Sequence, residues 1–352
     1  MRQTLRIWID LANSPHPLLF APLARGLEAQ GHEVMVTVRD NAQTVDLARE
    51  YWPEAAVVGA ESPASPVAKT TTLARRVRNL ARWARGRHLD VAISHNSYAQ
   101  IVAARLLGIP VVTASDFEHQ PANHLAFRLA TCILMPEALR DADIRGQGAT
   151  RRKSVFYPGL KEEVYIGNFE PDREILSKLG IERSGDDVIV VTRTPPTRAI
   201  YHRFPNPLFV EILQALEKEP AARVVVLTRH QEQREAINAL HLRKSIVPAE
   251  TVDARSLMYV ADLVLGAGGT MTREAALLGV PTLSLFRGEQ PAVDRWLEQH
   301  GMLRRIATPQ EVVPVHPRPA DPRSVDELAR RSDELINVFL TTIEAIANRA
   351  HP

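Results

Sequence analysis

Short apolar runs and amphipathic stretches alternate along the chain. The first apolar run, Leu5–Asp10, is followed by Pro17–Gln30, in which leucines recur every four residues and share one face of a helix. Gly31 is typical of a helix end, and a second apolar run, Val34–Val38, begins three residues later. This order of strand, helix and strand is typical of a βαβ unit, so the pattern predicts a parallel sheet.

The alternation continues through both halves of the chain. In the first half it predicts further strands at Val91–Ser94, Val111–Ser115, Cys132–Met135 and Ser154–Tyr157, and a helix at Tyr98–Leu107. In the second half it predicts strands at Val188–Val191, Arg223–Leu227, Ser245–Val247, Leu263–Leu265 and Thr282–Leu285. Helices are expected there at Pro207–Leu216, Gln231–Leu240, Met271–Leu278 and Ala292–His300, with a final helix near Val325–Asn348.

The length of 352 residues favours two domains over one. Proline and glycine gather near Pro158, and a polar run, Glu182–Asp187, precedes the point where the strand pattern starts again. We therefore expect two Rossmann-like α/β domains. Residues 1–160 would form the N-terminal domain, 161–187 a linker, 188–322 the C-terminal domain, and 323–352 a C-terminal helix that packs back on the first domain.

Composition narrows the class of protein. The formal net charge of +2 gives no reason to expect a nucleic-acid partner. The single cysteine, Cys132, excludes an internal disulfide and a cysteine-based zinc cluster, and we expect no metal and no cofactor. No run approaches the roughly 20 apolar residues of a membrane span, and no secretory signal pattern precedes Leu5. These features favour a cytoplasmic protein.

A glycine-rich turn follows the predicted strand Leu263–Leu265. Gly268 and Gly269 would let the backbone approach a ligand, and the helix start behind them would attract a phosphate. The hydroxyl residues Thr270 and Thr272 would cap the helix or bind the same anion, and Glu274 is placed to accept hydrogen bonds from a ribose. The same residues would also suit a tight connection that binds nothing.

This turn and the Gly279–Pro281 segment after it resemble the C-terminal signature of GT-B glycosyltransferases, in particular MurG-like enzymes. The stretch is also similar to nonhydrolysing UDP-N-acetylglucosamine 2-epimerases, in which a Glu-Arg-Pro element follows; Glu289 and Gln290 match it imperfectly. The N-terminal segments Asn13–Pro17 and Gln30–Val34 resemble MurG-like enzymes as well. Together with Ser115–His119, these segments most resemble the domain of unknown function 354 family, which implies a GT-B fold with two sheets facing a central cleft.

Polar residues follow several predicted strands of the first half, at the sheet edge where open α/β folds bind ligands. His16 is expected to stand in a loop as the base that deprotonates an acceptor hydroxyl, as the resemblance implies; a buried ring would pass that role to Asp116 or Glu118. Alternatively, these side chains cap helices or face solvent. The other candidates at this edge are expected to act on the sugar or to line the cleft: His119, Asn13, Ser14, His95 and Asn96.

Two arginines follow strands of the second half. Arg193 and Arg229 would bind the diphosphate of a nucleotide-sugar, because a guanidinium donates two parallel hydrogen bonds to one anion. Thr194 would add a hydroxyl, and Glu289 and Gln290 would line the cleft. Isolated loop arginines are often only solvated.

The segment Leu73–His88 is a basic amphipathic helix that would contact an anionic membrane or would simply pack with a solvated basic face. The resemblance implies three functions. The first is a metal-independent glycosyltransferase that moves a sugar from a UDP-sugar or another nucleotide-sugar to an unknown acceptor, which is lipid-linked if the membrane contact exists. The second is a UDP-sugar 2-epimerase, and the third is a non-catalytic protein that binds sugar nucleotides.

Overall fold

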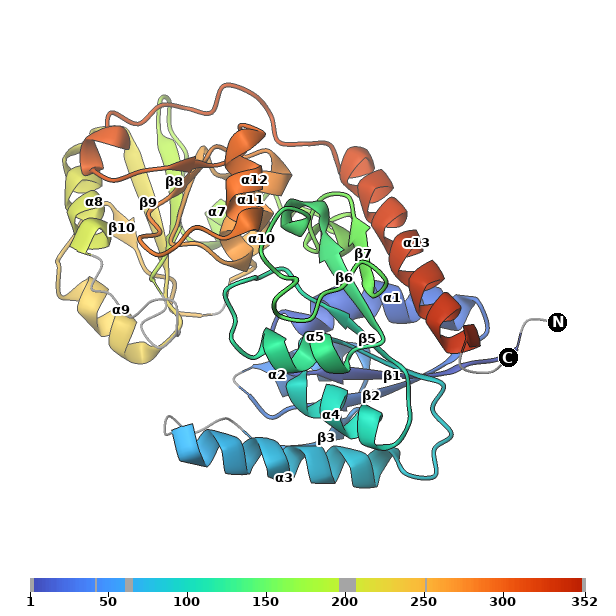
Figure 1. Ribbon diagram of the computed structural model, residues 1–352. Helices are drawn as coiled ribbons and strands as arrows, with labels where there is room; N and C mark the ends of the chain where they lie inside the picture. The colour runs from blue at the N-terminus through green and yellow to red at the C-terminus, as the bar shows by residue number, and fades with distance from the viewer. Residues whose placement is uncertain (1–2, 42, 61–65, 196–206, 251, 350–352) are drawn as a thin grey trace. The chain divides into compact units, whose positions relative to one another are not determined.

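The computed structural model describes residues 3–41, 43–60, 66–195, 207–250 and 252–349 (Figure 1). The chain divides into two compact units, the first formed by Met1–Tyr165 with Arg330–Pro352 and the second by Ile166–Ala329. Each unit contains one parallel sheet with helices around it, which confirms the predicted pair of α/β domains. No helix in the described part of the chain is long and apolar enough to cross a membrane.

The first unit contains a seven-stranded parallel sheet with the order β3-β2-β1-β4-β5-β6-β7. Its strands are β1 (Arg6–Leu11), β2 (Glu33–Val38), β3 (Ala56–Val57), β4 (Val91–His95), β5 (Val111–Ala114), β6 (Cys132–Pro136) and β7 (Ser154–Tyr157). The chain moves outward from β1 to β3 and then crosses to β4 on the other side of β1. The strand order therefore reverses between β1 and β4.

Helices α1 to α6 and the last helix, α13, complete the first unit. They are α1 (His16–Ala29), α2 (Thr44–Tyr51), α3 (Pro66–Ala84), α4 (Tyr98–Leu106), α5 (Asn123–Leu129), α6 (Glu163–Ile166) and α13 (Val325–Arg349). Phe339 and Ile343 of α13 are fully buried in one core with Leu23 of α1. At Gly26 an added Cβ would lie 2.7 Å from Cδ1 of Leu340, so a larger residue there would force this leucine side chain to move. The predicted return of the last helix to the N-terminal domain is confirmed.

The second unit contains a six-stranded parallel sheet with the order β10-β9-β8-β11-β12-β13. Its strands are β8 (Val188–Arg193), β9 (Ala222–Leu227), β10 (Ser245–Ile246), β11 (Leu263–Gly266), β12 (Thr282–Ser284) and β13 (Arg304–Arg305). Its helices are α7 (Ile175–Lys178), α8 (Pro207–Lys218), α9 (Gln231–Asn238), α10 (Ala254–Val260), α11 (Thr270–Leu278) and α12 (Ala292–Gln299). Here the strand order reverses between β8 and β11.

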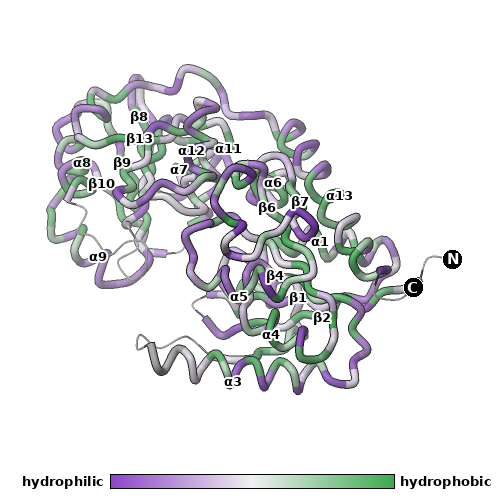
Figure 2. The backbone as a smooth tube through the Cα atoms, in the orientation of Figure 1, coloured by the Kyte–Doolittle hydropathy of each residue, from purple (hydrophilic) through white to green (hydrophobic). Residues whose placement is uncertain are grey.

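The strands are mainly hydrophobic, whereas many of the connections are hydrophilic (Figure 2). The central strands are buried on both faces: Val188–Val191 of β8 and Val224–Val226 of β9 have exposures of at most 1%. This explains why they appear in the sequence as continuous apolar runs rather than as alternating patterns.

The structure differs from the expected linker at 161–187. Lys161, Glu162 and Glu163 are buried in the first unit, and the residues that follow contain α7. Phe169 packs against Tyr259 with ring centroids 6.0 Å apart, within the second unit. The two-residue edge strands β3 and β13 were also not predicted.

Candidate functional site

The predicted site residues gather at the carboxyl ends of the strands, next to the point in each sheet where the strand order reverses. In the first unit they follow β1, β4 and β5, and in the second they follow β8, β9 and β11. Ligands of open α/β sheets bind at this position because the loops diverge there and leave a crevice. Each unit therefore has one candidate site.

The site of the first unit is centred on Asp116, directly after β5. Its Oδ1 lies 3.1 Å from Nε2 of His95 at the end of β4, and its Oδ2 contacts Nζ of Lys161. Lys161 also lies 2.6 Å from Oε1 of Glu162. Asp116 and Lys161 are each 7% exposed and Glu162 is 1% exposed. Two carboxylates, an ammonium and an imidazole thus share a largely dehydrated space in which proton affinities are easily shifted.

The side chain of Asn96 links the segments that follow β4 and β5. Asn96 has a φ of +50°, a left-handed conformation that asparagine tolerates better than most residues. Its side-chain amide donates to Oγ of Ser115 (2.9 Å) and to Oδ1 of Asn123 (3.2 Å). These hydrogen bonds hold the loop after β4 against the loop after β5, and so fix the separation of His95 and Asp116.

His16 does not occupy the exposed loop that we expected. It begins α1, its side chain is 4% exposed, and its ring lies 5.3 Å from the ring of His95. The backbone N–H of Ala12 donates to Nδ1 of His16 (3.1 Å), so the proton of the neutral ring is on Nε2. Burial lowers the pKa of His16 well below 6.5, and His95 and Lys161 lower it further. A dehydrated ring whose basic nitrogen is already occupied does not suit a general base.

The remaining candidates of the first unit lie around this cluster. Glu118 is 5% exposed, and its Oε1 lies 3.4 Å from Nε2 of His119. Asn13 is exposed and accepts a hydrogen bond from Asn41 (3.1 Å), whereas Ser14 contacts Thr44 (3.4 Å). Glu118 and His119 thus remain candidates for acid–base chemistry, while Asn13 and Ser14 belong to the rim. No group of three or more histidine, cysteine, aspartate or glutamate residues in the described ranges is arranged to hold a metal ion.

The site of the second unit is built on the turn between β11 and α11. Gly268 and Gly269 have φ values of +84° and +86°, which explains why both positions hold glycine. At Gly266 an added Cβ would lie 1.9 Å from Oγ1 of Thr272, so the turn folds tightly against its own helix. Thr272 is thereby buried in the packing of the turn. The helix N-cap is Gly269, which has no side chain to cap the amides of the first turn.

Arg193, at the end of β8, is largely buried beside this turn. Burial, together with repulsion from Arg229, lowers its pKa to about 10, and Glu274 of α11 opposes the shift. Its Nε is buried and has no hydrogen-bond partner among the described residues. Thr194 is 5% exposed, and its hydroxyl bonds to the side chain of Gln233 (2.7 Å) rather than facing outward.

An ion pair that we did not predict joins α11, the helix that follows this turn, to α12. Arg273 of α11 is 6% exposed, and its Nε donates to Oδ1 of Asp294 in α12 (2.9 Å). The sequence analysis assigned no role to Arg273, and only packing identifies it as buried. Glu289 and Gln290, at the start of α12, lie nearer the surface, and Gln290 bonds to Glu298 (2.9 Å).

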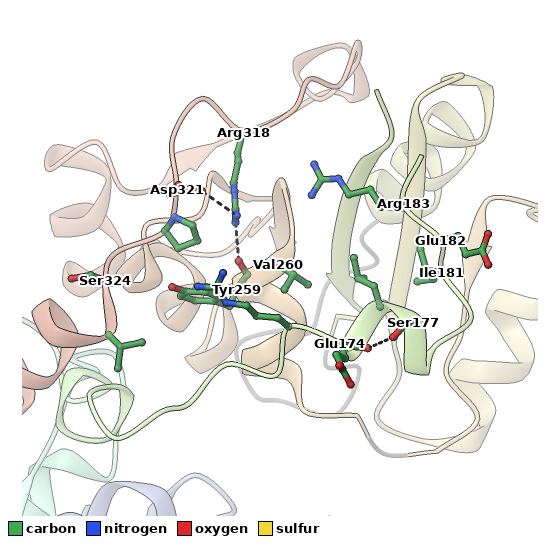
Figure 3. A pocket seen from close by; sticks show the side chains of 14 residues that line it. Glu174, Ser177, Ile181, Glu182, Arg183, Tyr259, Val260, Arg318, Asp321 and Ser324 are labelled. Atoms are coloured by element: carbon green, nitrogen blue, oxygen red, sulfur yellow. Dashed lines mark hydrogen bonds and ion pairs between the residues drawn. The ribbon is translucent and has the colours of Figure 1, made fainter. Parts of the chain in front are cut away.

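A cavity of about 850 Å³ lies at the opposite, amino-terminal side of the second sheet (Figure 3). Two of the arginines that line it, Arg318 and Arg183, already have partners within the protein. Arg318 donates to the carbonyl oxygen of Tyr259 (2.7 Å), and Arg183 donates to both oxygens of Asp262 (2.8 and 2.9 Å). This cavity contains none of the predicted site residues, and its arginines are less suited to an incoming anion than Arg193 is.

Known proteins of the same fold cover nearly the whole chain. The UDP-GlcNAc 2-epimerase of Methanocaldococcus jannaschii, in complex with UDP-GlcNAc and UDP, is 13% identical, with a TM-score of 0.69 over 96% of this chain and 100% of that one. The spinosyn rhamnosyltransferase SpnG is 18% identical, with a TM-score of 0.54 over 98% and 94%. At these identities the similarity establishes the fold, which is the expected GT-B fold.

The sequence also has a relative at higher identity. The uncharacterized protein MJ0665 of Methanocaldococcus jannaschii is 33% identical over 299 residues, which are 83% of this chain and 85% of the relative. A family model described as "Protein of unknown function (DUF354)" matches residues 5–347. The chain belongs to the DUF354 family.

Proposed function

We propose that the protein is an enzyme that binds a nucleotide-sugar on its second unit and transfers the sugar to an acceptor. The observation that carries the proposal is that the Arg193 guanidinium is buried without a full set of hydrogen-bond partners among the described residues. Its guanidinium is largely buried, is repelled by Arg229, and has one N–H without a partner among the described residues. A buried donor without a partner costs about 1–3 kcal/mol, and an anion would relieve both this cost and the repulsion.

The glycine turn makes a diphosphate the anion that fits best. Gly268 and Gly269 leave the backbone accessible, and the N-cap of α11 is a glycine, which offers no side chain to the amides of the first turn. Helix N-termini and planar guanidinium groups are both effective phosphate ligands. Glu274 interacts with Arg193 and lies one turn into α11, where its carboxylate would accept hydrogen bonds from the ribose. UDP-sugars are the first donors to test, because relatives of the same fold are named for UDP-GlcNAc.

The Asp116–His95 pair is the acid–base centre of the proposed reaction, in the role that the buried His16 cannot fill. An acceptor hydroxyl loses its proton to this pair, its oxygen bonds to C1 of the sugar, and the bond from C1 to the diphosphate breaks. Asp116 suits this role because Lys161 and His95 favour its ionised form. Arg193 would stabilise the negative charge on the departing diphosphate.

A UDP-sugar 2-epimerase is the second candidate. The observation in its favour is that Glu118 and His119 form a further close pair, with 3.4 Å between Oε1 and Nε2, in the loop that also carries Asp116. Removal and return of a proton on the sugar needs several acid–base groups, and this loop supplies them. A protein that only binds sugar nucleotides remains the third candidate.

The test begins with binding and continues with product analysis. Thermal shift and isothermal titration with UDP-, GDP-, dTDP- and CDP-sugars identify the donor. NMR of the sugar-containing products formed in D2O then distinguishes epimerisation from transfer. Epimerisation converts the sugar and exchanges its C2 proton without an acceptor, whereas transfer releases the nucleoside diphosphate only when an acceptor is present. Failure of every nucleotide-sugar to bind would refute the proposal, and binding without either product would favour the third candidate.

We also propose that the first unit contacts an anionic membrane. The evidence is a concentration of basic residues in one segment of this unit. Residues 62–89 contain six arginines, one lysine and no carboxylate, while the rest of the chain has 36 basic residues against 41 acidic ones. We call Arg75, Arg78, Arg82 and Arg85 the arginine stripe; all four are exposed. Their spacing places them on the side of α3 opposite the buried Leu80 and Ala84.

The neighbouring helices support this assignment. α3 packs beside α4 and α4 beside α5 (Figure 1), and neither α4 nor α5 contains an acidic residue. Leu106 of α4 and Leu125 of α5 are 71% and 41% exposed. Basic side chains on one helix and exposed leucines on the next helices suit the interface of a membrane, where cations meet lipid phosphates and apolar side chains meet acyl chains. A lipid-linked acceptor would be reached at such a surface.

A further inference from the structure

Lys161 is a buried lysine in the segment that follows β7, and its role depends on the proposed function of the Asp116–His95 pair. Its side chain is 8% exposed, which is rare for a lysine unless the ammonium is paired. Nothing in the sequence around it, Gly159-Leu160-Lys161-Glu162-Glu163, distinguishes it from a solvated loop lysine. Tertiary structure alone brings it to the carboxyl end of β5.

The ammonium of Lys161 and the imidazole of His95 approach different oxygens of the same carboxylate. Nζ of Lys161 contacts Oδ2 of Asp116, while Nε2 of His95 lies 3.1 Å from Oδ1. Nζ also lies 2.6 Å from Oε1 of Glu162. Asp116 is therefore held in one orientation, with Oδ1 turned toward the imidazole and Oδ2 occupied by a cation.

The segment that carries Lys161 is fixed in turn by α13. Glu163 accepts a hydrogen bond from the backbone N–H of Leu160 (2.8 Å) and forms an ion pair with Arg331 of α13. Gly159 has a φ of +71°, and an added Cβ there would lie 1.8 Å from Oε2 of Glu163, so the carboxylate fits only against glycine. Ser332 of α13 donates to the carbonyl oxygen of Val164 (2.6 Å). The last helix thus determines where Lys161 stands.

A contribution to folding does not by itself account for this arrangement. A buried ion pair often contributes little, because dehydration of both charges offsets their attraction. We propose that Lys161 is a positioning residue, which keeps the Asp116 carboxylate ionised and oriented toward His95, and that Arg331 holds the segment in which Lys161 acts. Lys161 acts through Asp116 and is not itself the proton acceptor.

The charges around Asp116 and His95 determine in which direction their titration should shift when a neighbouring residue is replaced. Lys161 and Glu162 after β7 and His16 of α1 lie near Asp116 and His95. Arg76 of α3 interacts with His16, and Glu118 and His119 belong to the loop that carries Asp116. Loss of the Lys161 cation favours protonation of both Asp116 and His95. The titration midpoint of the pair, the pH at which it has taken up half a proton, must therefore rise. Loss of the Glu162 anion has the opposite effect, so the midpoint must fall.

The experiment titrates the histidine Cε1–H resonances of the full-length protein by NMR, with His95 assigned through a His95→Gln variant. It needs no substrate, so a negative result is distinguishable from failure of the proposed function, which the nucleotide-sugar binding assay decides. In Lys161→Met the His95 midpoint should rise by about one pH unit or more, and in Lys161→Arg it should return toward the wild-type value. An unchanged midpoint in folded Lys161→Met would overturn the proposal.

Two further variants keep the proposal testable if Lys161→Met does not fold. Glu162→Gln should lower the His95 midpoint; a rise or no change would contradict the assignment. Arg331→Met should raise the midpoint by less than Lys161→Met does, whereas Arg330→Met, at an exposed neighbouring position, should leave it unchanged. Equal effects of the two arginine variants would refute the role of Arg331. Once an activity is known, the acidic limb of its pH profile should shift upward in Lys161→Met while the KM for the nucleotide-sugar stays the same.

Discussion

The guanidinium of Arg76 donates from Nη2 to both carboxylate oxygens of Asp10, each at 2.9 Å. Asp10, in β1, is fully buried, and Arg76, in α3, is 5% exposed. Arg76 also donates to the carbonyl oxygen of Val58 (2.9 Å) and to Oγ of Ser97 (3.1 Å). One arginine of the basic helix therefore serves the interior of the first unit, whereas the arginine stripe next to it faces solvent.

Arg76→Met should therefore destabilise the protein strongly. Removal of Arg76 leaves the buried Asp10 carboxylate without its ionic partner, and loss of one partner of a buried pair typically costs about 3–5 kcal/mol. Arg75→Met is the matched control, since the adjacent Arg75 is exposed, and its effect should stay within about 0.5 kcal/mol. Urea unfolding monitored by circular dichroism measures both. Equal stability of the two variants would show that the ion pair does not hold α3 in place.

His16→Leu should reduce stability at pH 7.5 by about 1–3 kcal/mol, because the N–H of Ala12 loses its acceptor in a buried position. This differs from an exposed loop histidine, whose replacement would cost little. Chemical denaturation of wild type and variant at this pH is the measurement. A variant as stable as wild type would contradict the buried, hydrogen-bonded position of His16.

The same histidine should make stability depend on pH. Burial holds the pKa of folded His16 well below 6.5, so between that pKa and 6.5 the unfolded state binds more protons. Its contribution to stability is therefore complete above about pH 6.5 and decreases as the pH falls toward the folded pKa. Unfolding free energies measured from pH 7.5 to 5 should fall more steeply for wild type than for His16→Leu. Parallel curves would show that His16 titrates normally.

Arg193→Met should weaken binding of UDP, used as the probe for the diphosphate, by at least about tenfold, because a charge-assisted contact contributes about 1.5–3 kcal/mol. Arg243→Met removes an exposed arginine from the loop after α9 of the same unit and should leave affinity unchanged. Isothermal titration of both variants gives the comparison. If UDP binds wild type and Arg193→Met equally, Arg193 is not a diphosphate ligand.

Replacement of the arginine stripe by alanine should abolish most binding to vesicles that contain phosphatidylglycerol, since each basic residue near an anionic surface contributes about 1 kcal/mol. A matched control replaces Arg25, Arg49, Lys218 and Arg243, which are exposed and lie outside α3, and lowers the net charge equally. Co-sedimentation at two salt concentrations measures binding. Equal loss in both variants would indicate net charge alone, and binding of the wild type to duplex DNA rather than to vesicles would refute the membrane contact.

Much of the fold is predictable from the order of apolar residues. Continuous runs such as Val188–Val191 identify buried parallel strands, because only strands covered on both faces can be apolar at every position. The turn at Gly268 and Gly269 was also predictable, because adjacent glycines between a strand and a helix indicate a tight turn. The structure gives both residues positive φ angles, which suit no other residue well. These properties are local, so the sequence alone indicates them.

The chemistry of the first unit was decided by tertiary structure. Asp116 was predictable as a candidate because it follows a strand, but its partner Lys161 lies 45 residues away in an expected linker. Likewise, the sequence placed His16 correctly after the first strand but not its burial, which depends on how α1 packs. Burial and pairing arise from contacts between distant segments, and these contacts set proton affinities. The sequence by itself therefore determined where side chains leave the sheets, and only packing decided which of them are charged, paired or able to bind a ligand.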